Sequence, residues 1–173
     1  MQIKILIIAV LVGCSYLIGE YIYKAYTNRH KQLNDLIRIL EIVRMDLSFG
    51  LYTLEEIFKR VGDKTEYCTS VFFKNMEYEL HNNQSKVLDE ILNENIELLT
   101  RDTYLQDNEV DELKKLIITL GKSDIESQTR MIDISIENFK KLTLETKEDI
   151  DKKGAVYRKL STIIGLVIGI ILI

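Results

Sequence analysis

The start of the chain is almost wholly apolar. Residues 3–19 contain only Lys4 and the small Ser15 as polar breaks. At about 1.5 Å per residue, a helix of this length nearly spans a bilayer core of roughly 30 Å. Tyrosines favour the membrane–water interface, and three that follow can lengthen the segment, namely Tyr21, Tyr23 and Tyr26. The run therefore predicts an N-terminal transmembrane segment.

The end of the chain is also apolar, but the run is shorter. Residues 160–173 extend only about 21 Å as a helix, which allows a partial insertion. A segment that begins near Ala155 is long enough to span, provided that Arg158 and Lys159 extend their charges toward the headgroups. We expect a second transmembrane segment here. For both ends, the alternative is a helix buried in a soluble core.

Between the two ends, apolar residues recur every three or four positions, and no stretch alternates as a convincing strand does. A first stripe continues the N-terminal helix as far as Gly50, which ends it. The residues of this stripe are Leu33, Leu36, Ile37, Leu40, Val43 and Leu47. Thr53 and Glu56 have the spacing of a capping box, which predicts a short helix to about Val61 that stops at Gly62.

Two further helices are expected in the middle of the chain. The first covers residues 66–81, and its buried side chains are expected to be Val71, Phe72, Met76 and Leu80. The aromatic group of Tyr67, Phe72, Phe73 and Tyr78 is either part of the core or a partner-binding patch. Ser85 is expected to cap a helix that starts at Lys86, with an apolar stripe of Leu88, Ile91, Leu92, Ile96 and Leu99.

The last two helices complete an all-α fold. Asp107 and Asn108 open one that Gly121 closes, and Ser123 or Asp124 caps the other. Beyond Leu144 the pattern thins to charges, as in a solvated rod. The sequence thus predicts an antiparallel helical bundle of about six helices, flanked by N- and C-terminal transmembrane segments.

The expected domains are an N-terminal transmembrane segment with its interface over residues 1–28, a cytoplasmic helical bundle over residues 29–153, and a C-terminal transmembrane segment over residues 154–173. Positive charges flank the cytoplasmic side of membrane segments, and both apolar runs carry them on the side of the middle domain. These charges are Lys24, Arg29, Lys31 and Arg38 after the first run, and Lys147, Lys152, Lys153, Arg158 and Lys159 around the start of the second.

A competing signal lies inside the first apolar run. Leu11-Val12-Gly13-Cys14 fits the lipobox of bacterial lipoproteins, in which the cysteine is lipidated after cleavage. The residues after Cys14 stay apolar, however, whereas a mature lipoprotein usually begins with a polar tether. An extracytoplasmic lipoprotein binding module lipidated at Cys14 remains the alternative reading. Cys14 and Cys68 are not expected to form a disulfide.

Small residues recur at four-residue spacing in both apolar runs. Gly165 and Gly169 form a G-x-x-x-G motif, and Gly13 lies four residues after Ala9. Such residues let two membrane helices approach closely, so we treat Gly165, Gly169 and Gly13 as candidate membrane helix packing residues. Glycine is also common in membrane helices without any such role, and both readings stay open.

Few residues suit catalysis or metal binding. Neither His30 nor His81 has a cysteine or carboxylate at a convincing ligand spacing. The chain has no G-x-x-x-x-G-K-[ST], G-x-S-x-G or H-E-x-x-H motif. Its net charge of -4 gives no general attraction to nucleic acid. We therefore expect a protein that is not an enzyme, with no catalytic residue, metal site or cofactor.

Several motifs follow one another in a specific order. After the N-terminal anchor come Tyr26-Thr27-x-Arg29-x-x-Gln32-Leu33, then Gly50-x-x-Thr53-Leu54-Glu55-Glu56, and then Phe72-Phe73. The longest is Leu116-x-x-x-Leu120-Gly121-x-x-Asp124-x-x-x-Gln128, and Gly165-x-x-x-Gly169 ends the series. In order and spacing, over essentially its whole length, the chain resembles the stage III sporulation protein AB family of endospore-forming bacteria.

The resemblance implies a protein of the mother-cell membrane, part of the channel-like complex that links mother cell and forespore. It also implies a likeness to the cytoplasmic domains of the F-type platform protein of type II secretion and type IV pilus systems. Such a scaffold couples a cytoplasmic secretion-type ATPase, encoded as the family's neighbour, to other membrane subunits. The implied partners are this ATPase, those subunits and the membrane, and no nucleic acid.

Overall fold

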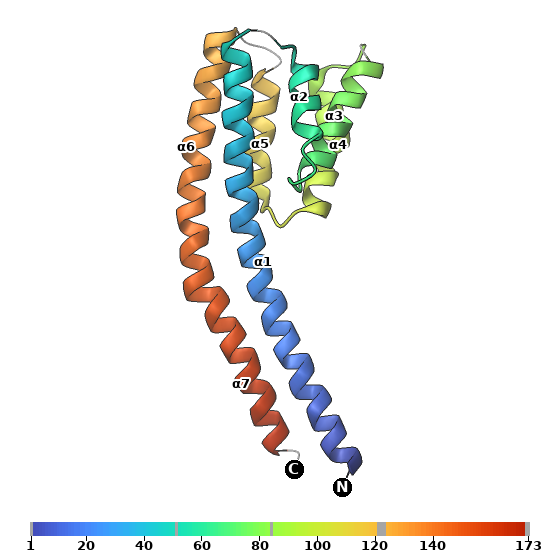
Figure 1. The fold of residues 1–173 in the computed structure, drawn as a ribbon, viewed down its shortest axis with the longest axis vertical. Helices are drawn as coiled ribbons and strands as arrows, with labels where there is room; N and C mark the ends of the chain where they lie inside the picture. Colours follow the sequence, from blue (N-terminus) through green and yellow to red (C-terminus); the bar gives the residue numbers. More distant parts are fainter. Residues whose placement is uncertain (1, 51, 84, 121–123, 172–173) are drawn as a thin grey trace. The chain divides into compact units, whose positions relative to one another are not determined.

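The computed structural model describes residues 2–50, 52–83, 85–120 and 124–171, and all regular elements in these ranges are helical (Figure 1). The elements are α1 (Gln2–Ser48), α2 (Leu54–Gly62), α3 (Ser70–Asn82), α4 (Leu88–Asp102), α5 (Asp107–Leu120), α6 (Ile125–Asp149), the π-helix η1 (Ile150–Gly154) and α7 (Ala155–Ile171). The predicted all-α class is confirmed.

The chain divides into two compact units. One unit combines the chain's two ends, Met1–His30 and Leu144–Ile173, and the other is Lys31–Thr143. Helices α1 and α6 each contribute to both units. The predicted borders at residues 28/29 and 153/154 concern membrane embedding, and they stay a prediction.

The unit Lys31–Thr143 is built around a single apolar core. The stripe on α1 is buried in it, as are the rings of Phe58, Phe72 and Phe73. These rings pack edge to face or tilted, with centroids 5.1 and 5.6 Å apart. Tyr67 is buried beside them, whereas Tyr78 is 61% exposed. Most of the aromatic group is therefore ordinary core.

Local capping explains several helix ends. Gly50 has a φ of 62°, the left-handed conformation that terminates α1. The Thr53 hydroxyl accepts from the Glu56 N–H at 3.3 Å, and the Glu56 carboxylate accepts from the Thr53 N–H at 2.7 Å, so the predicted capping box is present. Asp124 accepts from the Ser127 N–H at 2.9 Å and so caps α6.

Two predicted helix starts are wrong. Helix α3 begins at Ser70 rather than residue 66, because three-residue turns from Lys64 to Tyr67 and from Tyr67 to Ser70 precede it. Helix α4 begins at Leu88, with Val87 and not Ser85 at the capping position. Val71, expected in the core, is 51% exposed. The predicted roles of Gly121 and Ser123 lie outside the described residues.

Polar contacts tie α1 to two other helices of this unit and to the connection between α4 and α5. Asp46 accepts a bond from Arg60 of α2 at 2.9 Å, and Arg44 pairs with Asp133 of α6 at 2.5 Å. The Gln32 side chain accepts from the N–H of Tyr104, in the connection between α4 and α5, at 2.7 Å. These partners are specific to one register, so they orient helices that the apolar core alone would leave free to slide.

The π-helix η1 lies within the unit formed by the chain ends and was not predicted. A π segment holds about one residue more than the α-helical turn it replaces. Its last residue, Gly154, is buried, and a Cβ there would lie 3.3 Å from the Tyr23 ring and 3.5 Å from the Tyr26 ring. Close packing on two tyrosines of α1 therefore accompanies the change of helix type.

Candidate functional site

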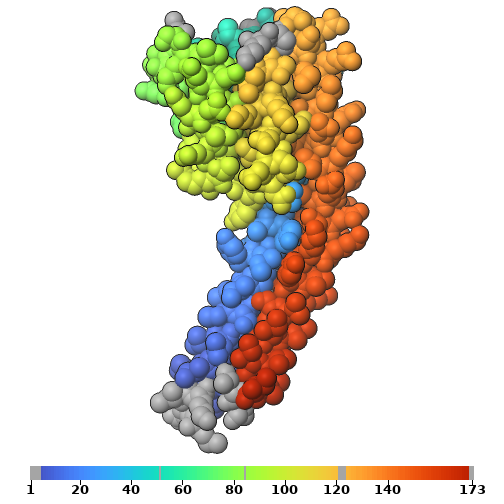
Figure 2. Space-filling model, turned by 180° about the vertical axis from the view of Figure 1, so that it is seen from behind, coloured from blue at the N-terminus to red at the C-terminus, as the bar shows by residue number. Residues whose placement is uncertain are grey.

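The strongest candidate site is the surface where the first part of α1 packs on α7. In Figure 1 these segments lie side by side within one unit, and Figure 2 shows them in contact on the opposite face. The Ser161 hydroxyl donates to the Ser15 carbonyl at 2.6 Å. This bond links α1 directly to α7.

Glycines set the distance between the two helices. A Cβ on Gly165 would lie 2.6 Å from the Ser15 Cβ, and one on Gly169 would lie 3.1 Å from an Ile8 methyl group. A Cβ on Gly19 of α1 would meet the Arg158 backbone and the Ser161 Cβ at 3.0 Å. At these positions, any larger residue would force the backbones apart.

The three glycines singled out from the sequence therefore differ in their surroundings. Gly165 and Gly169 are buried against α1, whereas Gly13 is exposed and a Cβ there would meet no atom within 4 Å. Gly165 and Gly169 thus both lie in the contact between α1 and α7, and Gly13 lies outside it. Whether any of them packs within a membrane stays a prediction.

The polar end of this helix pair was not anticipated from the sequence. Glu20 lies 3.8 Å from the Arg158 guanidinium, which also stacks 4.4 Å from the centre of the Tyr23 ring. Such a cation–π contact gains strength where water is scarce. Glu20 is the first acidic residue in the chain, at the end of an apolar run, and that isolation is the signal that could have identified it.

A second polar layer follows towards α6. Asp149 lies 2.7 Å from Lys153 and 3.9 Å from Arg29, so two cations flank one carboxylate. His30 bonds through Nδ1 to the Thr146 hydroxyl at 2.8 Å. Arg29, one of the basic residues that suggested an orientation, thus also joins α1 to α6.

Other chemically interesting residues lie in Lys31–Thr143. Burial raises the pKa of Asp35, against the opposing charges of Lys31 and Arg38. Burial also raises the pKa of Cys68, and the Asp35 charge adds to the effect. A thiol held in its neutral form is a poor nucleophile. Cys14 and Cys68 are both free.

The described residues contain no group of three histidine, cysteine or acidic side chains placed to hold one metal ion. What distinguishes the molecule is instead its apolar helices. Helical stretches Ile5–Ser48 and Ile125–Ile171 each contain a window long and apolar enough to cross a membrane, judged by length and composition alone. In the first window only 6% of residues are buried inside the protein, which is unlike a soluble core helix.

These features define a class, namely a helical protein with candidate membrane spans near both ends and a helical core between them. The family model of stage III sporulation protein AB matches residues 4–173, and the chain belongs to this family. Membership makes it a sporulation-related protein of a family not known for enzymes. No curated protein and no solved structure shows a significant match to the chain.

Proposed function

We propose that the chain is a non-enzymatic scaffold subunit of a mother cell–forespore channel complex. In this role it resides in the mother-cell membrane, and its residues 29–153 lie in the cytoplasm. There it couples a cytoplasmic secretion-type ATPase to other membrane subunits, as the F-type platform protein does in type II secretion systems. The observation that carries the proposal is the family match over residues 4–173.

The charge distribution supports the proposed orientation. Basic residues lie on the inner flank of both apolar ends, while Glu20 is the single acidic residue before Asp35. Helices α1 and α7 pack together in one unit, and each carries its basic residues on the side of the middle domain. A single orientation in the membrane therefore places the basic flanks of both segments on the cytoplasmic side. The mixed charges on exposed helix faces are typical of a solvated surface rather than of a catalytic cleft.

Site-directed labelling tests the orientation. Cys14 and Cys68 are replaced by serine, and the exposed Lys141 is changed to cysteine as the reporter. A membrane-impermeant maleimide should label this reporter only after sporulating cells are lysed. A Gln2→Cys reporter in the same background should react in intact cells, since the tips are proposed to cross the membrane. Labelling of Lys141→Cys in intact cells would refute the cytoplasmic placement.

Mass spectrometry of the unchanged chain, in which Cys14 is present, separates the scaffold from the lipoprotein alternative. Cleavage before Cys14 would remove Ile8 and Val12, which lie against Gly169. The proposal therefore expects an intact mass equal to that of the uncleaved chain. A lipid mass shift that Cys14→Ala abolishes would support the lipoprotein instead.

Coupling to an ATPase needs its own experiment. The full chain is co-expressed with the ATPase encoded beside it and purified in detergent. We expect the two to elute together by size exclusion, whereas an unrelated membrane protein carrying the same tag should not retain the ATPase. Separate elution at micromolar concentrations of both would argue against direct coupling.

A further inference from the structure

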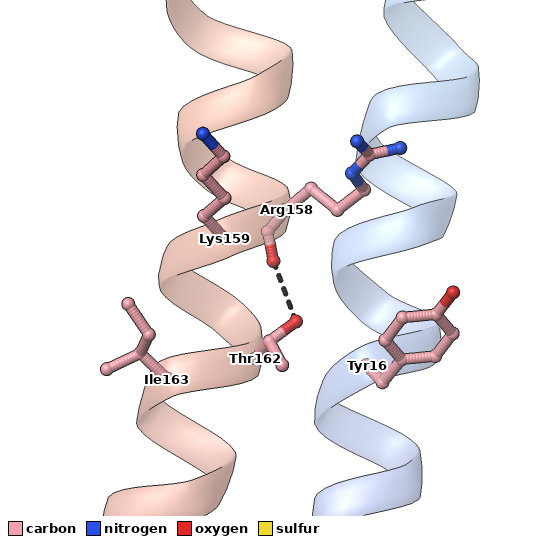
Figure 3. Close-up of a pocket in the computed structure, with 5 residues that line it drawn as sticks. All are labelled: Tyr16, Arg158, Lys159, Thr162 and Ile163. Carbon is pink, nitrogen blue, oxygen red and sulfur yellow. Dashed lines mark hydrogen bonds between the residues drawn. The ribbon is translucent and has the colours of Figure 1, made fainter.

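The helix pair carries an open cavity near the end of its apolar surface. The cavity measures about 560 Å³ and is lined by Tyr16 of α1 and by Arg158, Lys159, Thr162 and Ile163 of α7 (Figure 3). Tyr16 and Thr162 follow Ser15 and Ser161 in the sequence, so the cavity lies beside the contact between the two helices. All of its lining residues belong to one compact unit.

The cavity has a surplus of positive charge. The Arg158 guanidinium lies 3.8 Å from the Glu20 carboxylate and 4.4 Å from the centre of the Tyr23 ring, and these two contacts orient it. A guanidinium has five N–H donors, and a single carboxylate at that distance leaves several of them available. Lys159 is exposed and makes no ion pair among the described residues. The described residues that line the cavity therefore include two cations and no carboxylate.

The side chains are arranged as at a membrane interface. In Figure 3, the Arg158 guanidinium, the Lys159 ammonium and the Tyr16 hydroxyl all point toward the same end of the helix pair, away from Ile163. The Thr162 hydroxyl donates to the Arg158 carbonyl at 3.0 Å, so it forms part of the wall. Basic and tyrosine side chains extend in this way toward lipid headgroups.

Below the polar tips, the surface of α7 is apolar and uncovered. Its exposed side chains include Ile163 at 56%, Val167 at 48% and Ile170 at 71%. A free phosphate ion would use only the cations, whereas a lipid would use the cations and this apolar track together. The continuity of the two surfaces favours the lipid.

We propose that this cavity binds the phosphate of an anionic phospholipid, with Arg158 and Lys159 as its cationic partners, the Tyr16 hydroxyl as a donor and the acyl chains along α7. The proposal rests on membrane insertion of α1 and α7, and not on coupling to an ATPase. Basic pockets between membrane helices on the cytoplasmic side are a recurrent setting for anionic headgroups.

Native mass spectrometry of the full chain tests the proposal. The protein is released from detergent in the presence of equal amounts of phosphatidylglycerol and phosphatidylcholine. We expect phosphatidylglycerol to be retained in preference. Lys159→Gln should weaken this retention roughly fivefold, since one cation near anionic headgroups contributes about that factor, and Arg158→Gln with Lys159→Gln should weaken it further. Tyr16→Phe should weaken it by a smaller factor.

The matched control removes two positive charges elsewhere on the same unit. Lys24→Gln with Lys147→Gln changes the net charge equally at exposed positions outside the cavity. This variant should retain phosphatidylglycerol as the unchanged chain does. Circular dichroism should show the same helix content in all variants. If the double variant unfolds, the single variant Lys159→Gln decides the test, because Lys159 has no ion pair among the described residues that its replacement would break.

Three results would overturn the site. They are equal retention of the two lipids, equal losses in the cavity and control variants, and displacement of the lipid by millimolar inorganic phosphate. The last would mean that the cations bind phosphate without the lipid. These outcomes are independent of the ATPase experiment. If the chain and the ATPase elute separately but the chain retains phosphatidylglycerol selectively, only the proposed coupling is refuted. If they elute together but the chain shows no lipid preference, only the lipid site is refuted.

Discussion

At the scale of single residues, the capping box of α2 makes a measurable contribution. The Glu56 carboxylate accepts hydrogen bonds from the Thr53 N–H and the Thr53 hydroxyl. These bonds, with the N–H bond as the larger cause, hold the pKa of Glu56 below its usual value. Because this carboxyl pKa is lower in the folded protein, the bonds stabilise the fold at pH values above the usual pKa of a glutamate. That stabilisation is lost as the pH falls through the lowered pKa of the folded state. Thr53→Ala should lower the free energy of unfolding by about 1 kcal/mol at neutral pH. Urea unfolding of the full chain in detergent measures it.

The pH dependence distinguishes this cap from a general surface effect. Glu56→Ala should destabilise the protein at neutral pH and make little difference once the pH is below the lowered pKa. Glu41→Ala is the matched control, because Glu41 is an exposed glutamate of α1 without a bond among the described residues. A loss for Glu56→Ala that is the same at both pH values would contradict the assignment.

Residue patterns predicted some contacts and not others. The Thr53–Glu56 pair was predictable because its partners are three residues apart, and local spacing fixes their geometry. The contact of Gly165 with Ser15 was not, since the partners are far apart in sequence and depend on the register of two helices. Val71 was misassigned because Phe72 and Phe73 beside it fill the core, and three consecutive helical positions cannot all face it.

At the scale of elements, η1 makes a prediction about register. A π segment is equivalent to a helix with one inserted residue, so removing one residue there restores a continuous α-helix without rotating either flank. Deleting the exposed Asp151 should leave the free energy of unfolding unchanged or slightly raised. Circular dichroism during thermal unfolding of the full chain in detergent provides the measurement.

A deletion upstream in α6 is the matched control. Removing the exposed Lys141 rotates the residues that follow by about 100°. Thr146 and Asp149 then leave their partners His30 and Arg29. We expect this deletion to be clearly destabilising. If the two deletions lower the stability equally, η1 does not behave as a helix with one inserted residue.

The existence of most elements was predictable, whereas η1 was not. The 3.6-residue period of α1 and α5 is a property of the sequence itself, so their apolar faces could be read directly. Residues 150–154 are mostly charged, and the same residues would suit the exposed face of an α-helix equally well. Their π geometry accompanies the contact of Gly154 with Tyr23, which is a matter of tertiary packing. The start of α4 was missed for a related reason, since a turn from Asn83 to Lys86 precedes it.

At the scale of the whole molecule, the two ends of the chain form one unit, and its glycines predict a graded set of variants. Gly165→Leu should be the most destabilising, by about 1–3 kcal/mol, because its Cβ would lie 2.6 Å from the Ser15 Cβ and the backbones must separate. Gly169→Leu should cost less, since a Cβ there meets side-chain methyl groups at 3.1 and 3.4 Å. Gly13→Leu is the control and should be neutral, with open space around it. Thermal unfolding in detergent ranks the three, and a Gly13 variant as unstable as that of Gly165 would show that α1 and α7 do not pack through this face.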